Sequence, residues 1–210
     1  MHTGGVPGES GSAGAKTMIM LKYGNTNTFY IPGQPGGLLI DTDYAGTLNA
    51  FYRALKANGL TLKAIRYVMA THYHPDHMGL IGSLAEKGVK PLLLDVQESS
   101  VHFSDRIFER DRVPFTPVSE AGAAVISCGE SRAFLARLGI AGEIIHTPSH
   151  SEDSVSLILD DGDSFVGDLE PYGYLSAYEN NPDLKNDWVR ILSYSPKRIF
   201  HAHMPGYVSI

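Results

Sequence analysis

A dense group of histidines constrains this chain more than any other feature of its sequence. Three histidines and one aspartate fall within six positions, in the stretch His72-Tyr73-His74-Pro75-Asp76-His77. They directly follow the largely apolar run 65–70, which is typical of a buried strand. The group therefore lies where a strand ends and a loop opens into a helix. Imidazole nitrogen and carboxylate oxygen are the usual ligands of zinc and similar metals.

A surface histidine is usually an ordinary polar residue, but four ligand-type side chains in six positions are hard to explain in that way. If they were protonated they would repel one another, and if they were buried they would lose their hydration. Either effect would lower stability without a metal. We therefore interpret the group as part of a metal site, in which two neighbouring metals would need further ligands from elsewhere in the chain.

The composition narrows the class of protein. A length of 210 residues suits one domain with a sizeable core, or at most two small ones. The hydrophobic content of 43% and the charged content of 19% are typical of a soluble globular protein. The net charge is -6 and no basic run is present, which argues against a groove for nucleic acid. No apolar stretch approaches the length of a membrane span.

Two further features bear on location. The single cysteine, Cys128, excludes an internal disulfide and fits a reducing compartment. It follows an apolar run, so we expect a buried, inert thiol. The first fifteen residues are rich in Gly and Ser and have no hydrophobic stretch of the kind found in a signal peptide. We expect residues 1–15 to be a disordered tail or a cloning remnant and residues 16–210 to form a single domain. We expect a cytoplasmic protein, although a mature secreted form would also lack its signal.

Hydrophobic periodicity and turn residues predict the order of the elements. Strands are expected at 18–21, 28–31, 37–40, 65–70, 91–96, 143–146, 155–159, 164–166 and 197–202. Helices are expected at 45–58, 76–87, 131–138 and 184–193. Residues 160–163 (Asp-Asp-Gly-Asp) are expected to form a hairpin turn. This order predicts a mixed α/β (α+β) domain.

At this point the chain resembles the metallo-β-lactamase-fold hydrolases. The pattern His-X-His-X-Asp-His after a strand is the first point of resemblance. Residues 146–150 (His-Thr-Pro-Ser-His) resemble the family's Thr-Pro-Gly-His element, with Ser149 in place of Gly. Residues 165–168 (Phe-Val-Gly-Asp) resemble its strand-ending Gly-Asp element.

Two weaker motifs complete the resemblance, which runs from about Met18 to the C-terminus. Residues 198–203 (Arg-Ile-Phe-His-Ala-His) resemble the last strand and its terminal histidine, and the alignment favours His203 over His201. Met204 stands where the family usually has Gly. Residues 38–43 (Leu-Leu-Ile-Asp-Thr-Asp) resemble a strand that ends in Asp-Thr-Gly.

The resemblance implies a four-layer αββα sandwich with two divalent metal ions on loops at one edge of the sheets. The implied ligands are His72, His74 and His150 for the first metal, Asp76, His77 and His203 for the second, and Asp168 as the bridge. Zinc is the expected metal, and manganese and iron(II) suit the same ligands. Seven ligands leave coordination open for water and substrate. Two metals roughly 3.5–4 Å apart can share a hydroxide that attacks the substrate, with Asp76 and Asp168 as the catalytic residues.

The resemblance also reduces the number of reactions that we expect for this chain. The true β-lactamases of the fold do without a metal ligand at the position of Asp168, whereas thioester, lactone and phosphodiester hydrolases keep it. The flavin-dependent diiron branch usually has Glu where His74 stands, and the acidic balance weakens the RNA-processing branch. We therefore expect a dinuclear-metal-dependent hydrolase of an ester, thioester or lactone that acts on a small molecule. The alternatives are a β-lactam hydrolase, an iron-dependent oxidoreductase and a non-catalytic metal-binding module.

For several residues near these motifs the sequence allows two interpretations. Asp41 either orients a ligand imidazole or is a turn residue at a strand end. His146 and His201 either support the ligands or are simply partly buried. Tyr172 and Tyr174 either contact the substrate or pack with a satisfied hydroxyl. The segment 102–115 is either a solvated helix and loop with a few core anchors, or a lid or homodimer surface that includes His102.

Overall fold

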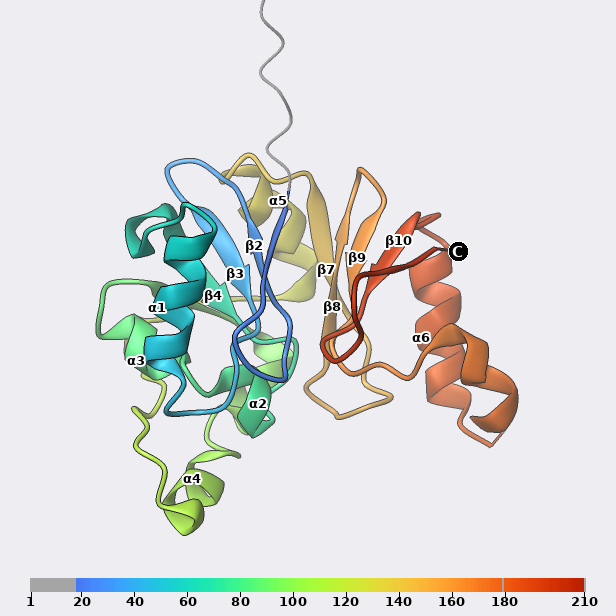
Figure 1. The fold of residues 1–210 in the computed structure, drawn as a ribbon. Helices are drawn as coiled ribbons and strands as arrows, with labels where there is room; N and C mark the ends of the chain where they lie inside the picture. The colour runs from blue at the N-terminus through green and yellow to red at the C-terminus, as the bar shows by residue number, and fades with distance from the viewer. Residues whose placement is uncertain (1–17, 179, 210) are drawn as a thin grey trace, which may run out of the picture.

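The computed structural model describes residues 18–178 and 180–209, and within them the strands form two sheets (Figure 1). One sheet has the order β1-β2-β3-β4-β5-β6 and the other has the order β11-β10-β9-β8-β7. The strands of the first sheet are β1 Ile19–Leu21, β2 Thr28–Ile31, β3 Gly37–Ile40, β4 Ile65–Met69, β5 Lys90–Leu94 and β6 Ala124–Ile126. Those of the second are β7 Gly142–His146, β8 Val155–Leu159, β9 Asp163–Phe165, β10 Arg198–Phe200 and β11 Val208–Ser209. The tail expected at 1–15 lies outside the described residues.

The helices are mostly short. The α-helices are α1 Leu48–Ala57, α2 Pro75–Met78, α3 Ile81–Ala85, α4 Asp105–Asp111, α5 Ser131–Ala136 and α6 Pro182–Leu192. The 3-10 turns are η1 Leu62–Ala64, η2 Asp95–Ser100, η3 Glu120–Gly122, η4 Cys128–Glu130 and η5 Tyr172–Tyr178. In the described part of the chain, none of these helices has the length and apolar character that crossing a bilayer requires.

Alternation of side chains along the strands produces the layers. Successive residues of a strand point to opposite faces of its sheet. On β3, Leu38 and Ile40 therefore join the core between the two sheets, whereas Leu39 joins the core beneath α1 and α3. On β5, Leu92 packs between the sheets and Leu93 packs on the helix side. The first sheet is thus buried on both faces.

The second sheet is covered by α6, which lies on the side away from the first sheet (Figure 1). Leu184, Trp188 and Ile191 of α6 are buried against Ile158 and Ile199 of the sheet. These helix residues recur at helical spacing, so they form one apolar face. The result is a four-layer αββα sandwich, which confirms the fold class expected from the sequence.

The direction of the strands gathers the expected ligands at one edge. Strands β3, β4 and β5 are parallel, and β9 is parallel to β10. Carboxyl ends of parallel strands meet at the same edge of a sheet. Asp41 follows β3, His72 follows β4, Asp168 follows β9 and His203 follows β10, while His150 lies in the connection from β7 to β8.

Some expected elements were wrong in detail. The single helix expected at 76–87 is two helices, α2 and α3, interrupted at Gly79 and Leu80. A Cβ on Gly79 would collide with the backbone at Asp43 and Ala45. The backbone at the helix break is therefore in close contact with the loop that follows β3. The short strands β6 and β11 were not expected, because two or three residues at a sheet edge carry little periodic signal.

Candidate metal centre

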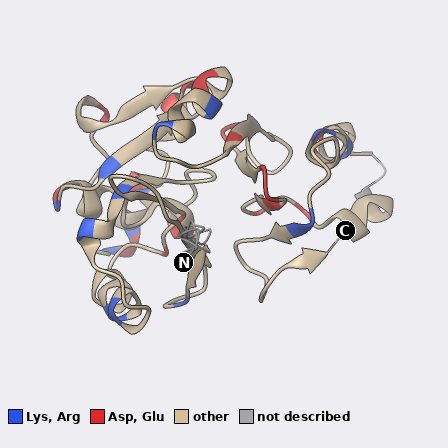
Figure 2. Ribbon diagram, turned by 90° about the horizontal axis from the view of Figure 1, so that it is seen from above, with Lys and Arg blue, Asp and Glu red and all other residues tan. Residues whose placement is uncertain are grey.

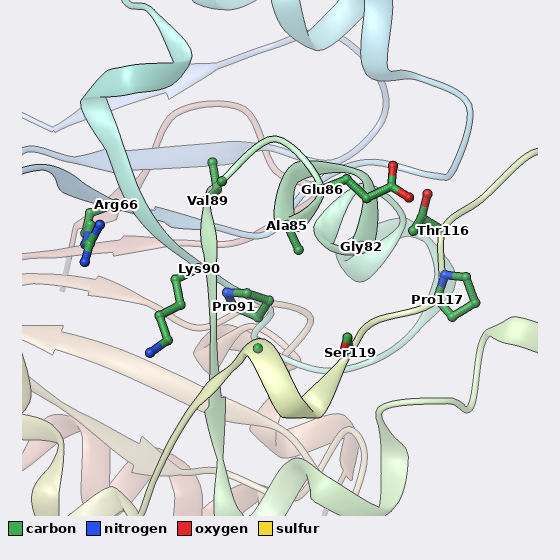
Figure 3. Close-up of a pocket in the computed structure, with 12 residues that line it drawn as sticks. Arg66, Gly82, Ala85, Glu86, Val89, Lys90, Pro91, Thr116, Pro117 and Ser119 are labelled. Atoms are coloured by element: carbon green, nitrogen blue, oxygen red, sulfur yellow. The ribbon is translucent and has the colours of Figure 1, made fainter.

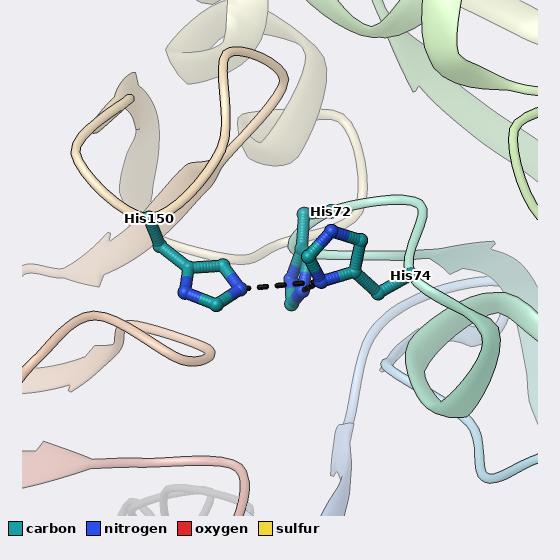
Figure 4. A group of neighbouring side chains, drawn as sticks. All are labelled: His72, His74 and His150. Atoms are coloured by element: carbon teal, nitrogen blue, oxygen red, sulfur yellow. Dashed lines mark hydrogen bonds between the residues drawn. The ribbon is translucent and has the colours of Figure 1, made fainter.

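The first group of ligand-type side chains contains three histidines that face one another (Figure 4). His72 and His74 lie on the loop between β4 and α2, and His150 lies on the loop between β7 and β8. The Nε2 atom of His72 is 2.9 Å from Nδ1 of His74, and Nε2 of His150 is 3.2 Å from the same Nδ1. These nitrogens all lie within 4.8 Å of one another, so the three side chains offer one metal-sized cradle.

The second group contains Asp76, His77 and His203. Pro75 occupies the first turn of α2, where its missing N–H leaves no hydrogen bond unmade, and Asp76 and His77 follow on that turn. The Nε2 atom of His203 is 3.2 Å from Oδ2 of Asp76, and Nε2 of His77 is 3.9 Å from the same oxygen. One donor atom from each residue falls within a 4.8 Å group.

Asp168 lies between the two groups. Its Oδ1 is 3.2 Å from Nε2 of His203, while its Oδ2 is 3.3 Å from Nε2 of His77 and 3.9 Å from Nε2 of His150. The carboxylate therefore faces both groups. The structure brings all seven expected ligands together at one edge of the sandwich, and their role as ligands stays a prediction.

Asp41 orients His77. Its Oδ2 is 3.1 Å from Nδ1 of His77, and both side chains are almost completely buried. This contact favours a proton on Nδ1, so that Nε2, which lies toward Asp76 and Asp168, is the nitrogen that a metal ion would take. Nε2 of His77 is buried and makes no hydrogen bond of good geometry. A buried nitrogen without a partner is costly, and a metal ion would supply that partner, so the donor set fits a metal.

Charge differs between the two groups. Burial, followed by the neighbouring imidazoles, holds the pKa of His72 far below its usual value, and burial also lowers the pKa of His150. Burial opposes the charge of His77 too, but the carboxylates of Asp41 and Asp168 outweigh it and raise its pKa to about 10. Hydrogen bonds to Asp168 and Asp76 raise the pKa of His203 to about 10. The carboxylates thus attract positive charge to this second group.

The backbone near the site adopts conformations that only some residues tolerate. Asp41 has φ +54°, and its side chain accepts hydrogen bonds from the backbone N–H (2.6 Å) and the hydroxyl (3.0 Å) of Thr71. Gly167, directly before Asp168, has φ +59°, and a Cβ there would collide with the Thr71 hydroxyl. Thr71 therefore links the strand ends that carry Asp41, His72 and Asp168. For Asp41, both interpretations hold: it ends a strand and it orients a ligand-type imidazole.

Three buried residues that the sequence did not single out hold the loops of the site. Asp153 accepts hydrogen bonds from the N–H of Tyr73 (2.7 Å) and the hydroxyl of Ser151 (2.8 Å), so it joins the two histidine loops. Gln97 donates to the carbonyls of Ala70 and Asp153, at 3.1 and 3.2 Å. Asn27 donates to the carbonyls of His201 (3.0 Å) and Met204 (2.6 Å), on either side of His203. No local pattern marks them, since all their partners except Ser151 are distant in the sequence.

The remaining histidines of the motifs lie outside the two groups. Nε2 of His146 contacts the carbonyl of Glu152 at 2.7 Å, which braces the loop that carries His150. His201 is buried beside Trp188, with ring centroids 6.4 Å apart, whereas His203 enters the site. The choice of His203 over His201 therefore agrees with the geometry.

The structure also shows the surroundings of Tyr172, Tyr174 and the segment 102–115, for which the sequence allowed two interpretations. Tyr172 packs edge-on against Trp188, and Tyr172 and Tyr174 are both exposed. In the segment 102–115, Phe108 is completely buried and Phe103 is exposed. These exposures agree with a solvated helix and loop that has a core anchor at Phe108, and the alternative of a lid or homodimer surface stays a prediction.

A larger cavity, of about 570 Å³, lies away from these groups (Figure 3). It is lined by residues at the start of β4 and β5, such as Arg66, Lys90 and Pro91, and by the segment around Pro117. Arg66 lies near the start of β4, whereas His72 follows the end of that strand. None of the expected ligands lines this cavity, so it is not part of the candidate metal centre.

The fold and the side chains together define an αββα protein with a candidate two-metal centre at the edge of its sheets. The family model described as the metallo-beta-lactamase superfamily matches residues 21–203. The chain therefore belongs to the metallo-beta-lactamase superfamily, whose members are largely hydrolytic metalloenzymes.

Two curated proteins are similar to the chain. The beta-lactamase-like protein 2 homolog of Drosophila melanogaster is 26% identical over 184 residues, which are 85% of this chain and 58% of that protein. The homolog of Caenorhabditis elegans is 24% identical and covers 86% of this chain and 56% of its own length. The chain thus spans little more than half the length of the curated relatives it matches.

Solved structures share the fold. A metallo-beta-lactamase family protein of Thermus thermophilus, TTHA1429, has a TM-score of 0.68 at 19% identity, over 91% of this chain and 75% of its own. TTHA1623, described in a di-iron-bound form, has a TM-score of 0.69 at 21% identity, over 92% and 94% of the two chains. At sequence identities this low, the two structures show that the fold is shared and nothing further about function.

Proposed function

We propose that the protein is a hydrolase that requires two divalent metal ions and cleaves an ester, thioester or lactone. One observation carries this proposal: the carboxylate of Asp168 lies between the two groups, with one oxygen 3.2 Å from His203 and the other 3.3 Å from His77 and 3.9 Å from His150. A carboxylate in that position suits the branches of the fold that keep it as a bridge, and it distinguishes this arrangement from the true β-lactamases.

The proposed ligands are the seven residues predicted from the sequence. His72, His74 and His150 would hold one ion, Asp76, His77 and His203 the other, and Asp168 would contact both. Two ions bound there would supply an activated water near neutral pH and a Lewis acid for the scissile carbonyl. We propose zinc as the native metal, and the di-iron form of a structural neighbour makes iron the first alternative to test.

The protein's own groups support such a reaction. Asp76 is about one-third exposed, and its hydrogen bond to His203 keeps its pKa below the usual value, although burial opposes this. It therefore stays ionised at neutral pH and lies where it can orient an attacking water by accepting a hydrogen bond. Asp168 is also held ionised: burial opposes its charge, but the neighbouring imidazoles of His203 and His77 outweigh burial and keep its pKa well below the usual value.

The experiment that tests this function is hydrolysis by metal-loaded protein over a fixed panel of substrates. The panel contains acyl-homoserine lactones, glutathione thioesters, a chromogenic cephalosporin and a phosphodiester. We expect turnover of one ester, thioester or lactone class, lost with a chelator and restored by metal. His102→Ala is the matched control for His72→Ala, because His102 is exposed and paired with Asp105 outside the centre.

Other results would select an alternative. Turnover of the cephalosporin alone would assign a β-lactam hydrolase. A single bound iron with redox activity would assign an oxidoreductase. Two bound metals with no turnover of any member would refute the hydrolase and favour a non-catalytic metal-binding module.

We further propose that the substrate is a small molecule, that the protein does not bind nucleic acid or a membrane, and that it is cytoplasmic. In Figure 2, acidic and basic residues are interspersed over both halves of the ribbon, which supports the absence of a nucleic-acid groove. The pKa of the half-buried Cys128 thiol is raised by burial, which suits an inert thiol in a reducing compartment. A homodimer through the segment 102–115 stays a proposal, which the molecular mass in solution tests.

A further inference from the structure

A small pocket lies beside the candidate metal centre, on the side of His74. It has a volume of about 220 Å³, and His74 and Phe103 line it together with Ser100 and Ser151. His74 belongs to the first histidine group, and Ser151 directly follows His150 of the same group. A molecule whose reacting bond lies at the metal centre would therefore extend naturally into this pocket.

The aromatic wall of the pocket is unusually open to solvent. The side chain of Phe103 is 57% exposed, and its ring centroid is 5.6 Å from that of His74. A single exposed apolar residue is common on protein surfaces and by itself needs no explanation. Here, however, the ring lines a cavity next to a reactive centre, which is where apolar side chains usually contact a ligand.

The position of Phe103 is fixed by the loop that carries the histidines. Ser104, which is completely buried, donates a hydrogen bond of 2.6 Å to the carbonyl of Tyr73, the residue between His72 and His74. The N–H of Phe103 itself donates to the carbonyl of Ser100 at 2.9 Å. The backbone at Phe103 is therefore anchored to the loop that carries His74, which keeps the ring beside that histidine.

The pocket also has a charge preference. The acidic residues that line it are Glu152, which is exposed, and Asp153, which is buried and already bonded to Tyr73 and Ser151. No Lys or Arg is among the lining residues that the structure describes. An anionic group in this pocket would meet acidic neighbours and no side-chain cation, so it is disfavoured. The exposed ring of Phe103 favours an apolar, uncharged group.

We propose that this pocket is a substrate subsite, in which Phe103 binds an uncharged apolar group attached to the scissile ester, thioester or lactone. The inference rests on the proposed function and names the substrate class more closely. At about 30 Å³ per water-sized group, 220 Å³ accommodates roughly seven such groups, so a short alkyl chain or a phenyl ring fits. Phe103 is then a residue that determines specificity.

Two series of compounds test the subsite. The first is a set of straight-chain esters from acetyl to octanoyl, read as kcat/KM. The second is the matching set of hydroxamic acids, whose head groups chelate divalent metals, read as Kd for the metal-loaded protein without any turnover. Burial of a methylene changes affinity by up to about fourfold. We expect wild-type values to improve by up to about fourfold for each methylene and to level off near the capacity of the pocket.

Variants at the same position separate specificity from folding. Phe103→Ala is expected to reduce the improvement to less than about twofold per methylene. Thermal stability should stay unchanged, because the side chain is exposed. Phe103→Leu should keep most of the dependence on chain length. Val189→Ala is the matched control, because Val189 is 61% exposed and lies on the solvent side of α6. A purely structural role for Phe103 would instead change all chain lengths equally.

The outcomes distinguish the two proposals. Hydroxamate affinity that rises with chain length, without hydrolysis of any ester in this series or of any thioester or lactone in the panel, would support the subsite and refute the proposed function. Hydrolysis without dependence on chain length, or a Phe103→Ala series that matches wild type, would refute the subsite alone. A protein that binds no hydroxamate and hydrolyses no ester, thioester or lactone would refute both.

Discussion

Asp187 offers the sharpest test of how this fold holds one of the proposed metal ligands. This α6 residue is only 5% exposed, and its Oδ2 accepts a hydrogen bond of 2.9 Å from the N–H of Ser149, the residue directly before His150. From the same helix, Arg190 donates to the carbonyl of His146 at 2.7 Å. Helix α6 therefore forms hydrogen bonds with both ends of the segment 146–149, which leads to His150, although the helix contributes no proposed ligand itself.

The size of the effect follows from these contacts. A hydrogen bond to a charged group contributes about 1.5–3 kcal/mol, and removing the acceptor leaves the N–H of Ser149 unsatisfied. Relief of the buried carboxylate offsets part of that loss, so we expect Asp187→Ala to lower the free energy of unfolding by about 1–2 kcal/mol. Groups that orient metal ligands change metal affinity by 10–100-fold. Asp187 acts one residue away from the ligand, so a loss of about tenfold is expected.

The assay is competition with a chromophoric chelator, combined with urea unfolding of the metal-free protein. Asp187→Asn keeps an acceptor for Ser149 and should retain metal affinity within about threefold of wild type. Asp183→Ala is the matched control, because Asp183 is an exposed acidic residue on the same helix. Wild-type metal affinity in Asp187→Ala, measured alongside a normal control, would refute the idea that this contact positions His150.

Asp187 should also make the stability of the protein depend on pH. Burial raises the pKa of Asp187 above its ordinary value of 3.8, although its hydrogen bonds to Ser149 oppose this. The folded state therefore binds this proton more tightly than the unfolded state. Protonated Asp187 thus stabilises the folded protein at low pH, and this contribution is lost as pH rises through the raised pKa. Asp187→Asn cannot ionise. Its stability relative to wild type should therefore increase as pH rises above 3.8, and a constant difference in urea midpoints would contradict this.

Three further predictions concern the centre itself. The double variant His72→Ala/His74→Ala should lose metal binding and activity but keep a cooperative unfolding transition, and full activity would remove the site assignment. Asp41→Asn should lower metal affinity by roughly 10–100-fold through His77, measured by the same chelator competition, and an unchanged affinity would show that the contact is not needed. Gly167→Ala should destabilise the fold by about 1–3 kcal/mol because of its positive φ, which denaturant unfolding measures, whereas a neutral result would show that the backbone there relaxes freely.

Much of the candidate centre was accessible from the sequence because its densest part is contiguous. His72, His74, Asp76 and His77 stand within one loop and one helical turn, so their spacing alone indicates a metal site. The more distant candidates, His150, Asp168 and His203, were implied only by the resemblance of short motifs to those of the family, and the structure brings them to the same edge. The choice between His201 and His203 depended on the alignment of one strand, and the geometry agrees with it.

The order of strands and helices was also predictable, since period-two and period-3.6 patterns record which faces are buried. Boundaries and short edge strands were not. The break in the helix at Gly79 depends on how closely that segment approaches the loop at Asp43, a distance that no local pattern contains. Strand β11, with two residues, has no periodicity to detect.

The sequence by itself determined the fold class and the chemical types of the proposed ligands, because both are written in local spacing and residue identity. Only the tertiary structure decided what surrounds them: Asp41 against His77, Asp187 against the loop of His150, and Phe103 against His74. Asp41 and Asp187 lie more than thirty positions from the residues they contact, and Phe103 lies nearly thirty from His74. Contacts at that separation are set by the packing of whole sheets and helices, which a short motif cannot encode.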